Sequence, residues 1–220
     1  FLTPYYKAIA PPPKLLQLYD NYEPDTRIDE HFTPIESREE NEFLDIVMVS
    51  GVMKEAMGFL HAKGRIVSSD PDEQKILVKK IWFNPYSRSP GKVGSSGFEH
   101  VFLAEIKNGT KMSGLHNWIY FMEQEKAGSI DYMGYIEKVD LGNKVILVEF
   151  RFSFNGIIKP ISSMLIGASP ELEMSLYTMC FLLRPNEVCP VTLGGQKVNI
   201  KTYTLKYKGE DLIGSAFSTI

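Results

Sequence analysis

Two histidines, His100 and His116, lie sixteen residues apart in a segment rich in small and polar side chains. We expect this segment to form a strand that ends in a turn, followed by a helix whose first turn carries His116. Two imidazoles brought together in this way can accept and donate protons near neutral pH, as general acid–base catalysis requires. Lys159, in the stretch Asn155-Gly156-Ile157-Ile158-Lys159-Pro160, is a third candidate for the same site.

The expected positions of the two histidines favour different roles. His116 is expected near the third residue of its helix, where free backbone N–H groups and the positive end of the helix dipole attract anions such as phosphate. The same dipole disfavours an imidazolium and lowers the pKa, which suits His116 as a general base. His100 is expected at the head of a strand beside Glu99, whose charge favours an imidazolium, so His100 suits a general acid.

Each candidate also has a simpler interpretation. Most single histidines are structural or merely exposed. The flanking glycines Gly97 and Gly114 favour a ligand site instead, because glycine lets a ligand approach the backbone closely. Lys159 precedes Pro160, which cannot continue a central strand, so the residues alone favour a solvated lysine at a sheet edge.

The first part of the chain is predicted to be helical. Ser37 is expected to cap a long helix with an apolar stripe that ends near Gly64, and Asp70-Pro71 to begin another helix. Residues 84–97 are rich in Ser, Gly and Pro and are predicted to connect two lobes. The predicted organisation is a helical N-terminal lobe over 1–88, with helices at 14–19, 37–64 and 70–82, and a β-rich catalytic lobe over 95–220.

The pattern beyond the connection is mostly that of strands. Residues 144–154 alternate polar and apolar side chains before an Asn155-Gly156 turn. The sequence therefore predicts an α+β fold in which the second lobe contains antiparallel sheets and two helices. The predicted strands span 101–106, 144–154, 179–183, 188–193, 196–207 and 212–219, and the two helices span 115–126, capped by Ser113, and 170–177, capped by Ser169.

The composition excludes several classes of function. The formal net charge is −3, so any binding of nucleic acid must rely on a local patch and not on the field of the whole protein. No apolar run of about eighteen residues exists, so no membrane span is predicted. The chain has no HExxH motif, phosphate-binding glycine loop or CxxC motif, which leaves zinc catalysis, P-loop hydrolysis and hydride transfer without support.

Two features bear on the compartment. Cys180 and Cys189 are the only cysteines, and they could face each other across a hairpin, but the sequence leaves open whether they are bridged. Asn108-Gly109-Thr110 is a glycosylation sequon on a predicted turn, which matters only in a secreted chain. We slightly favour secretion over an intracellular location.

With these residues identified, the chain resembles the EndoU family of uridylate-specific endoribonucleases over nearly its whole length. The resemblance is carried by motifs around both histidines, around Lys159 and in the C-terminal third. The matching stretches are Ser95 to Phe102, Gly114 to Ile119, Gly167 to Thr178, Trp82-Phe83 with Tyr86-Ser87-Arg88, Leu193-Gly194-Gly195, and Lys201 to Thr204.

The resemblance implies cleavage of single-stranded RNA at uridylates by attack of the 2′-hydroxyl, which gives 2′,3′-cyclic phosphate ends. His100, His116 and Lys159 carry over as the catalytic residues. The implied partner is U-containing RNA and not DNA, for a chain that we expect to be a monomer. Five residues carry over to substrate binding: Glu99 and Glu105, acidic positions near the first histidine, and Ser163, Tyr203 and Thr204, near the uracil-reading positions of the related coronavirus enzyme.

The resemblance also implies stimulation by a divalent cation, Mn²⁺ or Ca²⁺, whose ligands the sequence does not identify. Two other functions stay open. One is a diverged, catalytically weak RNA-binding domain, against which the presence of all three catalytic side chains argues. The other is a secreted domain that binds a protein partner, for which the sequence offers no specific feature.

Overall fold

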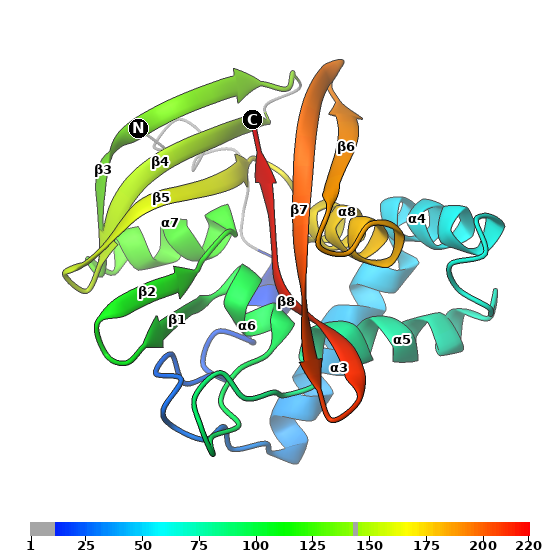
Figure 1. Cartoon of the computed structure of the whole chain (residues 1–220), viewed down its shortest axis with the longest axis horizontal. Coiled ribbons are helices and arrows are strands. Elements are labelled where there is room, and N and C mark those ends of the chain that lie inside the picture. The colour runs from blue at the N-terminus through cyan, green and yellow to red at the C-terminus, as the bar shows by residue number, and fades with distance from the viewer. Residues whose placement is uncertain (1–11, 143–144) are drawn as a thin grey trace.

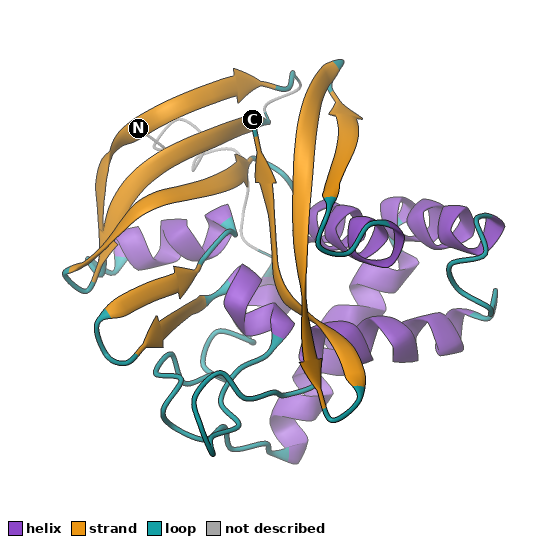
Figure 2. Cartoon of the chain, in the orientation of Figure 1, coloured by secondary structure: helices purple, strands orange, loops and turns teal. Residues whose placement is uncertain are grey.

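The computed structural model describes residues 12–142 and 145–220. The first described helices are followed by antiparallel strands with α7 and α8 between them, an α+β fold that confirms the predicted class (Figure 2). The helices are α2 (Pro13–Leu16), α3 (Pro34–Val49), α4 (Gly51–Ala62), α5 (Pro71–Phe83), α6 (Gly97–Phe102), α7 (Trp118–Lys126) and α8 (Pro170–Leu183). The strands are β1 (Ala104–Lys107), β2 (Lys111–Gly114), β3 (Ile130–Asp140), β4 (Ile146–Phe154), β5 (Ile157–Ile166), β6 (Val188–Leu193), β7 (Gln196–Tyr207) and β8 (Glu210–Thr219).

The strands of the described chain form three small antiparallel sheets, ordered β1-β2, β3-β4-β5 and β6-β7-β8. In Figure 1, α3, α4, α5 and α8 lie on one side of the molecule, β1 to β5 lie on the other, and β7 and β8 run between them. Helix α7 covers the second sheet, where the Phe121 ring meets those of Phe150 and Phe152 edge-on, with 5.3 Å between centroids in each case.

Side-chain caps define the helices of the first part. Asp70 accepts hydrogen bonds from the backbone N–H groups of Asp72 and Glu73, which confirms the predicted start of α5. The single helix predicted from Ser37 to Gly64 is wrong. Ser50 is extended between α3 and α4, and its hydroxyl accepts from the Met53 N–H, so that it caps a second helix.

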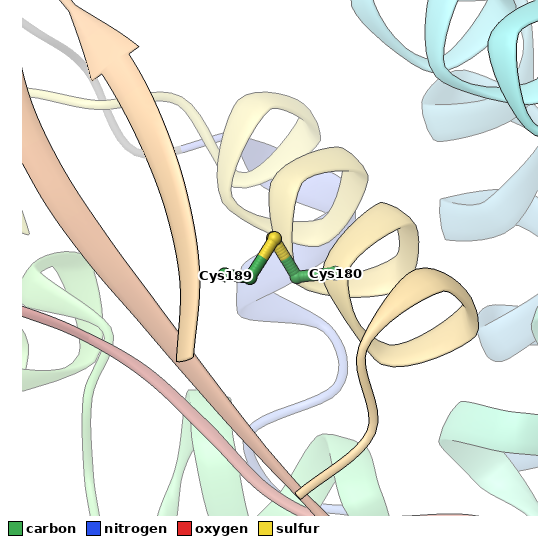
Figure 3. Close-up of a disulfide and its surroundings, with 2 residues drawn as sticks. All are labelled: Cys180 and Cys189. Carbon is green, nitrogen blue, oxygen red and sulfur yellow. A yellow bond between two sulfur atoms is a disulfide. The ribbon is translucent and has the colours of Figure 1, made fainter. Parts of the chain in front are cut away.

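One strand predicted in the C-terminal part is wrong, because its residues belong to the end of α8. Residues 179–183 were expected to form a strand, but they continue the helix that Ser169 caps. A short apolar run of this kind is buried equally well in either structure, so periodicity could not distinguish the two. Cys180, in this helix, is disulfide-bonded to Cys189 at the start of β6, so the bridge joins a helix to a strand and does not cross a hairpin (Figure 3).

Most C-terminal strands follow the prediction, whereas β2, β3 and β5 were missed. The bounds of β6 and β7 are confirmed, and β8 begins two residues earlier than expected. Strand β3 was missed because most of its side chains are exposed and its burial alternates only over its first half. Strand β5 was missed because it contains Pro160, which lies at an irregularity in the pairing with β4, on the edge strand of the sheet.

One hydrophobic core connects the helical and β-rich parts. It includes Trp82 from α5 and Tyr177 from α8, and the Trp82 indole N–H donates to the Thr178 hydroxyl at 2.8 Å. The division into lobes at 84–97 stays a prediction. In the described part of the chain, no helix is both long and apolar enough to cross a bilayer.

We predict that the disulfide stabilises the fold mainly by restricting the unfolded chain. Its two cysteines are nine residues apart in the sequence. For a loop of that length, the loss of chain entropy in the unfolded state stabilises the fold by about 2–3 kcal/mol. Replacing both cysteines by alanine should lower the free energy of unfolding in urea by that amount. Reductant should lower the stability of the wild type similarly and leave the variant unchanged. Equal unfolding midpoints for the two oxidised proteins would contradict this.

Candidate active site

His100 lies in the short helix α6 and not at the head of a strand, as the sequence had suggested. The Ser96 hydroxyl caps this helix by accepting from the Glu99 N–H at 3.0 Å. Gly97 is required for packing, because a Cβ there would lie 2.8 Å from the carbonyl oxygen of Ile213 in β8. This glycine therefore brings α6 against the third sheet and does not make room for a ligand.

The partner of His100 is Glu105 of β1, and not the adjacent Glu99. The His100 Nδ1 lies 2.7 Å from Glu105 Oε2, and because a carboxylate only accepts, Nδ1 carries the proton. Glu105 Oε1 accepts from Arg88 Nε at 2.8 Å and from the Ser95 hydroxyl. The Glu99 carboxyl group is fully buried and, among the described residues, has no side-chain hydrogen-bond partner, so Glu99 does not hold the His100 ring.

Burial and these contacts set the charge states. Burial lowers the pKa of His100 to about 4, although the neighbouring Glu105 opposes this shift. Burial also acts against ionisation of Glu105, but His100 and Arg88 outweigh it and hold the pKa of Glu105 at about 2. At neutral pH the pair is therefore a carboxylate that fixes a neutral imidazole, with Nε2 of His100 left unprotonated.

His116 lies in the connection between β2 and α7, packed along α6. The N–H of Leu115 donates to the His100 carbonyl at 3.0 Å, and the N–H of His116 donates to the Val101 carbonyl at 2.8 Å. Gly114 makes this contact possible, because its φ is +70° and a Cβ would collide with the His100 carbonyl. The two histidines are thus brought together by backbone contacts.

His116 precedes its helix, which corrects the predicted helix start and cap. Asn117 and not Ser113 caps α7, and its side-chain oxygen accepts from the N–H groups of Ile119 and Tyr120 at 3.1 Å. The Asn117 amide in turn donates to the buried Glu173 of α8 at 2.6 Å. Two N–H groups that could have bound an anion are therefore occupied, and α7 and α8 jointly fix the segment after His116.

The His116 ring is held on two sides. Its Nδ1 lies 3.2 Å from the Ser163 carbonyl, which can only accept, so Nε2 again carries the free lone pair. The ring stacks on Phe217 of β8 with 4.9 Å between centroids, and its centroid lies 6.5 Å from that of His100. Burial lowers the pKa of His116 well below its usual value, and the charges of Lys159 and His100 add to the shift.

Lys159 is buried in this cluster, which corrects the solvated edge lysine that the residues alone favoured. Only 8% of it is exposed, and its ammonium donates to the Gly114 carbonyl. Burial lowers the pKa of Lys159 to about 7. The Ser162 hydroxyl, from the same strand, donates to the Leu115 carbonyl at 3.1 Å. Strand β5 thus fixes the turn that precedes His116.

The residues predicted to bind substrate differ in their exposure and in their contacts. Glu99 and Glu105 have no exposed surface, so neither carboxylate can contact a ligand in this conformation. Ser163 is buried and its backbone carbonyl binds His116. Tyr203 is 46% exposed and stacks on Phe217, with 6.1 Å between centroids. Thr204 is bound through its N–H and hydroxyl to the Asn186 side chain.

Two residues of the site were missed by sequence reasoning. Arg88 lies in a quoted motif, but nothing local showed that its guanidinium would bind Glu105, seventeen residues away. Phe217 belongs to a strand whose apolar side chains all suggested core packing, yet its half-buried ring borders His116. Phe217 of β8 pairs with Lys201 of β7, and side chains two residues apart on a strand share a face. Phe217 and the exposed Tyr203 of β7 therefore lie on the same face of the sheet.

The arrangement suits proton transfer at an anionic group. Two imidazoles have fixed Nδ1–H tautomers and free Nε2 atoms, and a lysine lies beside them. No group of three or more His, Cys, Asp or Glu residues in the described chain is arranged to hold a metal ion. The groups that this arrangement offers for chemistry are the two imidazoles and the ammonium of Lys159.

Comparison with known proteins gives a consistent result. The family model described as Endoribonuclease XendoU matches residues 8–218. The chain is 45% identical over 206 residues to the uridylate-specific endoribonuclease EndoU of Drosophila melanogaster, covering 92% of this chain and 63% of that protein. It is 39% identical over 206 residues to the uridylate-specific endoribonuclease of Homo sapiens, covering 93% and 48% respectively.

Further similarities extend to a solved structure. The chain is 44% identical over 173 residues to the poly(U)-specific endoribonuclease-B of Xenopus laevis, covering 76% of this chain and 58% of that protein. The structure of XendoU, described as a splicing independent snoRNA processing endoribonuclease, superposes with a TM-score of 0.74 at 34% identity, covering 94% of this chain and 76% of that one. The chain spans about half to two thirds of the length of these curated relatives.

We predict that Glu105 sets the protonation of His100. Glu105→Gln keeps the shape of the side chain but removes the negative charge that raises the pKa of His100, so that pKa should fall below its wild-type value of about 4. NMR titration of the His100 ring in the wild type and in the variant measures the change directly. An unchanged titration of His100 in the variant would show that the carboxylate does not control it.

Proposed function

Because the chain belongs to the XendoU family of endoribonucleases, we propose that it cleaves single-stranded RNA at uridylates by transesterification. In this reaction the 2′-hydroxyl of the uridine attacks the adjacent phosphorus, the bond from phosphorus to the 5′-oxygen breaks, and a 2′,3′-cyclic phosphate forms. The observation that carries the proposal is the pair of imidazoles whose Nδ1 atoms are fixed by Glu105 and the Ser163 carbonyl. Such a pair leaves one Nε2 for each of the two proton transfers.

The environments of the histidines assign their roles. His116 has no carboxylate partner and lies beside Lys159, so its neutral form is the more strongly favoured, and its Nε2 takes the proton of the 2′-hydroxyl. His100 contacts an ionised carboxylate, which stabilises the imidazolium that a bound phosphodiester also favours. Its Nε2 then gives a proton to the leaving 5′-oxygen.

Lys159 stabilises the charge on the nonbridging oxygens as the phosphorane forms. Its ammonium is oriented by the Gly114 carbonyl and lies in buried surroundings, where a charge interaction is stronger than in water. Its pKa of about 7 in the free protein should rise when the phosphate binds, because the anion favours the ammonium form.

The uracil base has an aromatic surface available beside the reacting groups. Phe217 stacks on His116 and is only half-buried, and base stacking on aromatic rings is a common mode of recognition of single-stranded RNA. Tyr203 extends this surface on the solvent side. We propose Phe217 as the primary stacking residue; direct substrate contacts by Ser163 and Thr204 stay predictions.

The proposed reaction does not use a metal ion. The family resemblance implies stimulation by Mn²⁺ or Ca²⁺, but the described residues contain no cluster of three or more His, Cys, Asp or Glu side chains that could hold either ion. We therefore derive no step through the ion and propose that it acts by ordering the site or the RNA. The alternative of a catalytically weak RNA-binding domain is disfavoured, because all three candidate side chains converge, and a monomeric state stays a prediction.

An oligonucleotide with a single ribose at its only uridylate tests the function. We expect one cut, 3′ to that uridine, and a cyclic phosphate on the upstream fragment, because only the 2′-hydroxyl can act as the nucleophile. The all-deoxy strand of the same sequence is the matched control and should stay intact. Cleavage of the control, or incorporation of solvent oxygen in the first step, would indicate an activated water instead.

We predict that Lys159→Ala lowers the single-turnover rate more than it weakens RNA binding. The reason is that the ammonium faces a charge that grows only as the phosphorane forms, so its contribution is largest in the transition state. Lys159→Arg should restore little, because a planar fork replaces a compact charge in a buried site. An unchanged rate with weaker, salt-dependent binding would mean that Lys159 is only a phosphate anchor.

A further inference from the structure

The β1–β2 hairpin, residues 104–114, connects the two candidate histidines along the chain. It follows α6, which contains His100, and its second strand ends two residues before His116. The strands pair with Glu105 opposite Ser113 and Lys107 opposite Lys111. Both ends of the hairpin therefore adjoin the candidate site, one next to His100 and the other next to His116. This fixes the position of the hairpin side chains relative to the two imidazoles.

The two lysines share the face of the hairpin that carries Glu105. Side chains alternate along a strand, so Glu105 and Lys107 point to the same side, and residues directly opposite in an antiparallel pair do so as well. That side faces the active site, because Glu105 binds His100 there. Lys107 lies about 7 Å from Glu105 along the strand, at two residues of about 3.4 Å each. Its charge also lowers the pKa of His100, as a nearby cation should.

The lysine pair is unfavourable for the fold by itself. Like charges directly opposite each other on neighbouring strands destabilise a sheet. In the described part of the chain, no ion pair joins Lys107 or Lys111 to a carboxylate. Lys107 is also half-buried, which lowers its pKa, and Arg88 and Lys111 lower it further. A local conflict of this kind, next to an active site, is typical of a position selected for function.

We infer that this face of the hairpin binds a backbone phosphate of the RNA that flanks the scissile phosphate. The inference rests on the proposed endoribonuclease function. The protein has a net charge of −3, so the affinity for RNA has to come from a local cationic strip. Lys107 and Lys111 supply two such charges on the hairpin whose last residue, Gly114, binds Lys159 through its carbonyl. A phosphate between Lys107 and Lys111 reduces the repulsion between the two charges, because its negative charge attracts both ammonium groups.

The salt dependence of RNA binding tests this subsite. The probe is a single-stranded oligonucleotide of about twelve nucleotides with 2′-deoxyuridine as its only uridylate, so that binding is measured without cleavage. Replacing both lysines by alanine should reduce the slope of log Kd against log salt by about 0.7, the change expected for one lost phosphate contact on a single strand. The control replaces Lys54 and Lys63, at α4 on the far side of the molecule, and removes the same charge (Figure 1). It should leave the slope unchanged.

Cleavage of short and long substrates separates this inference from the proposed function. A uridine-containing dinucleotide has no flanking phosphate, so the hairpin variant should lose much less kcat/KM on it than on a longer RNA. The same variant should lose the advantage in kcat/KM that the wild type shows for a longer RNA. If the wild type cleaves neither substrate, the proposed function fails, while the binding slopes still decide whether the hairpin contacts RNA.

Two further results make the outcome decisive. Replacing both lysines by arginine should restore the wild-type slope, because the positive charges remain. The alanine variant should unfold at a temperature equal to or slightly above that of the wild type, because the like-charge pair has been removed. Equal slopes for the hairpin variant and the Lys54 and Lys63 control would overturn the inference.

Discussion

The candidate active site depends on one backbone contact, in which the turn from Gly114 to His116 lies against the carbonyl groups of α6. Two N–H groups of this turn bind the His100 and Val101 carbonyls, and they bring into one site two imidazoles that the sequence separates by a hairpin. Only glycine fits at 114, because a Cβ would occupy the position of the His100 carbonyl. Lys159 and Ser162 then bind the carbonyls of the same turn, so the third candidate residue is positioned by the contact that joins the first two.

Burial gives the three side chains their chemistry. Exclusion from water lowers the pKa values of both histidines and of Lys159, which makes the free site hold little positive charge. A phosphodiester reverses this preference when it binds, because its negative charge stabilises the imidazolium and the ammonium. The asymmetry between the histidines comes from Glu105, which is ionised and supported by Arg88. The site is thus prepared for an anion whose charge increases during the reaction.

Local signals predicted much of the fold, whereas contacts between distant segments decided the rest. The Asp70 cap and the Gly194-Gly195 turn allowed α5, β6 and β7 to be predicted, because their causes are adjacent in sequence. The family motifs supplied His100, His116 and Lys159, and the structure brings them together. The partner of His100 was not predictable in this way, since the adjacent Glu99 points into the core and Glu105 reaches the ring from the next strand. Phe217 was missed for the same reason.

The most direct test of the account is to remove the need for a general acid. In uridine 3′-(4-nitrophenyl phosphate) the nitrophenolate leaves without a proton, while the 2′-hydroxyl must still be deprotonated. We predict that His100→Ala cleaves this compound within about tenfold of the wild-type rate, whereas the rate of His116→Ala falls roughly 10²–10⁴-fold. Equal losses for the two variants, or a larger loss for His100→Ala, would contradict the assignment of His116 as base and His100 as acid.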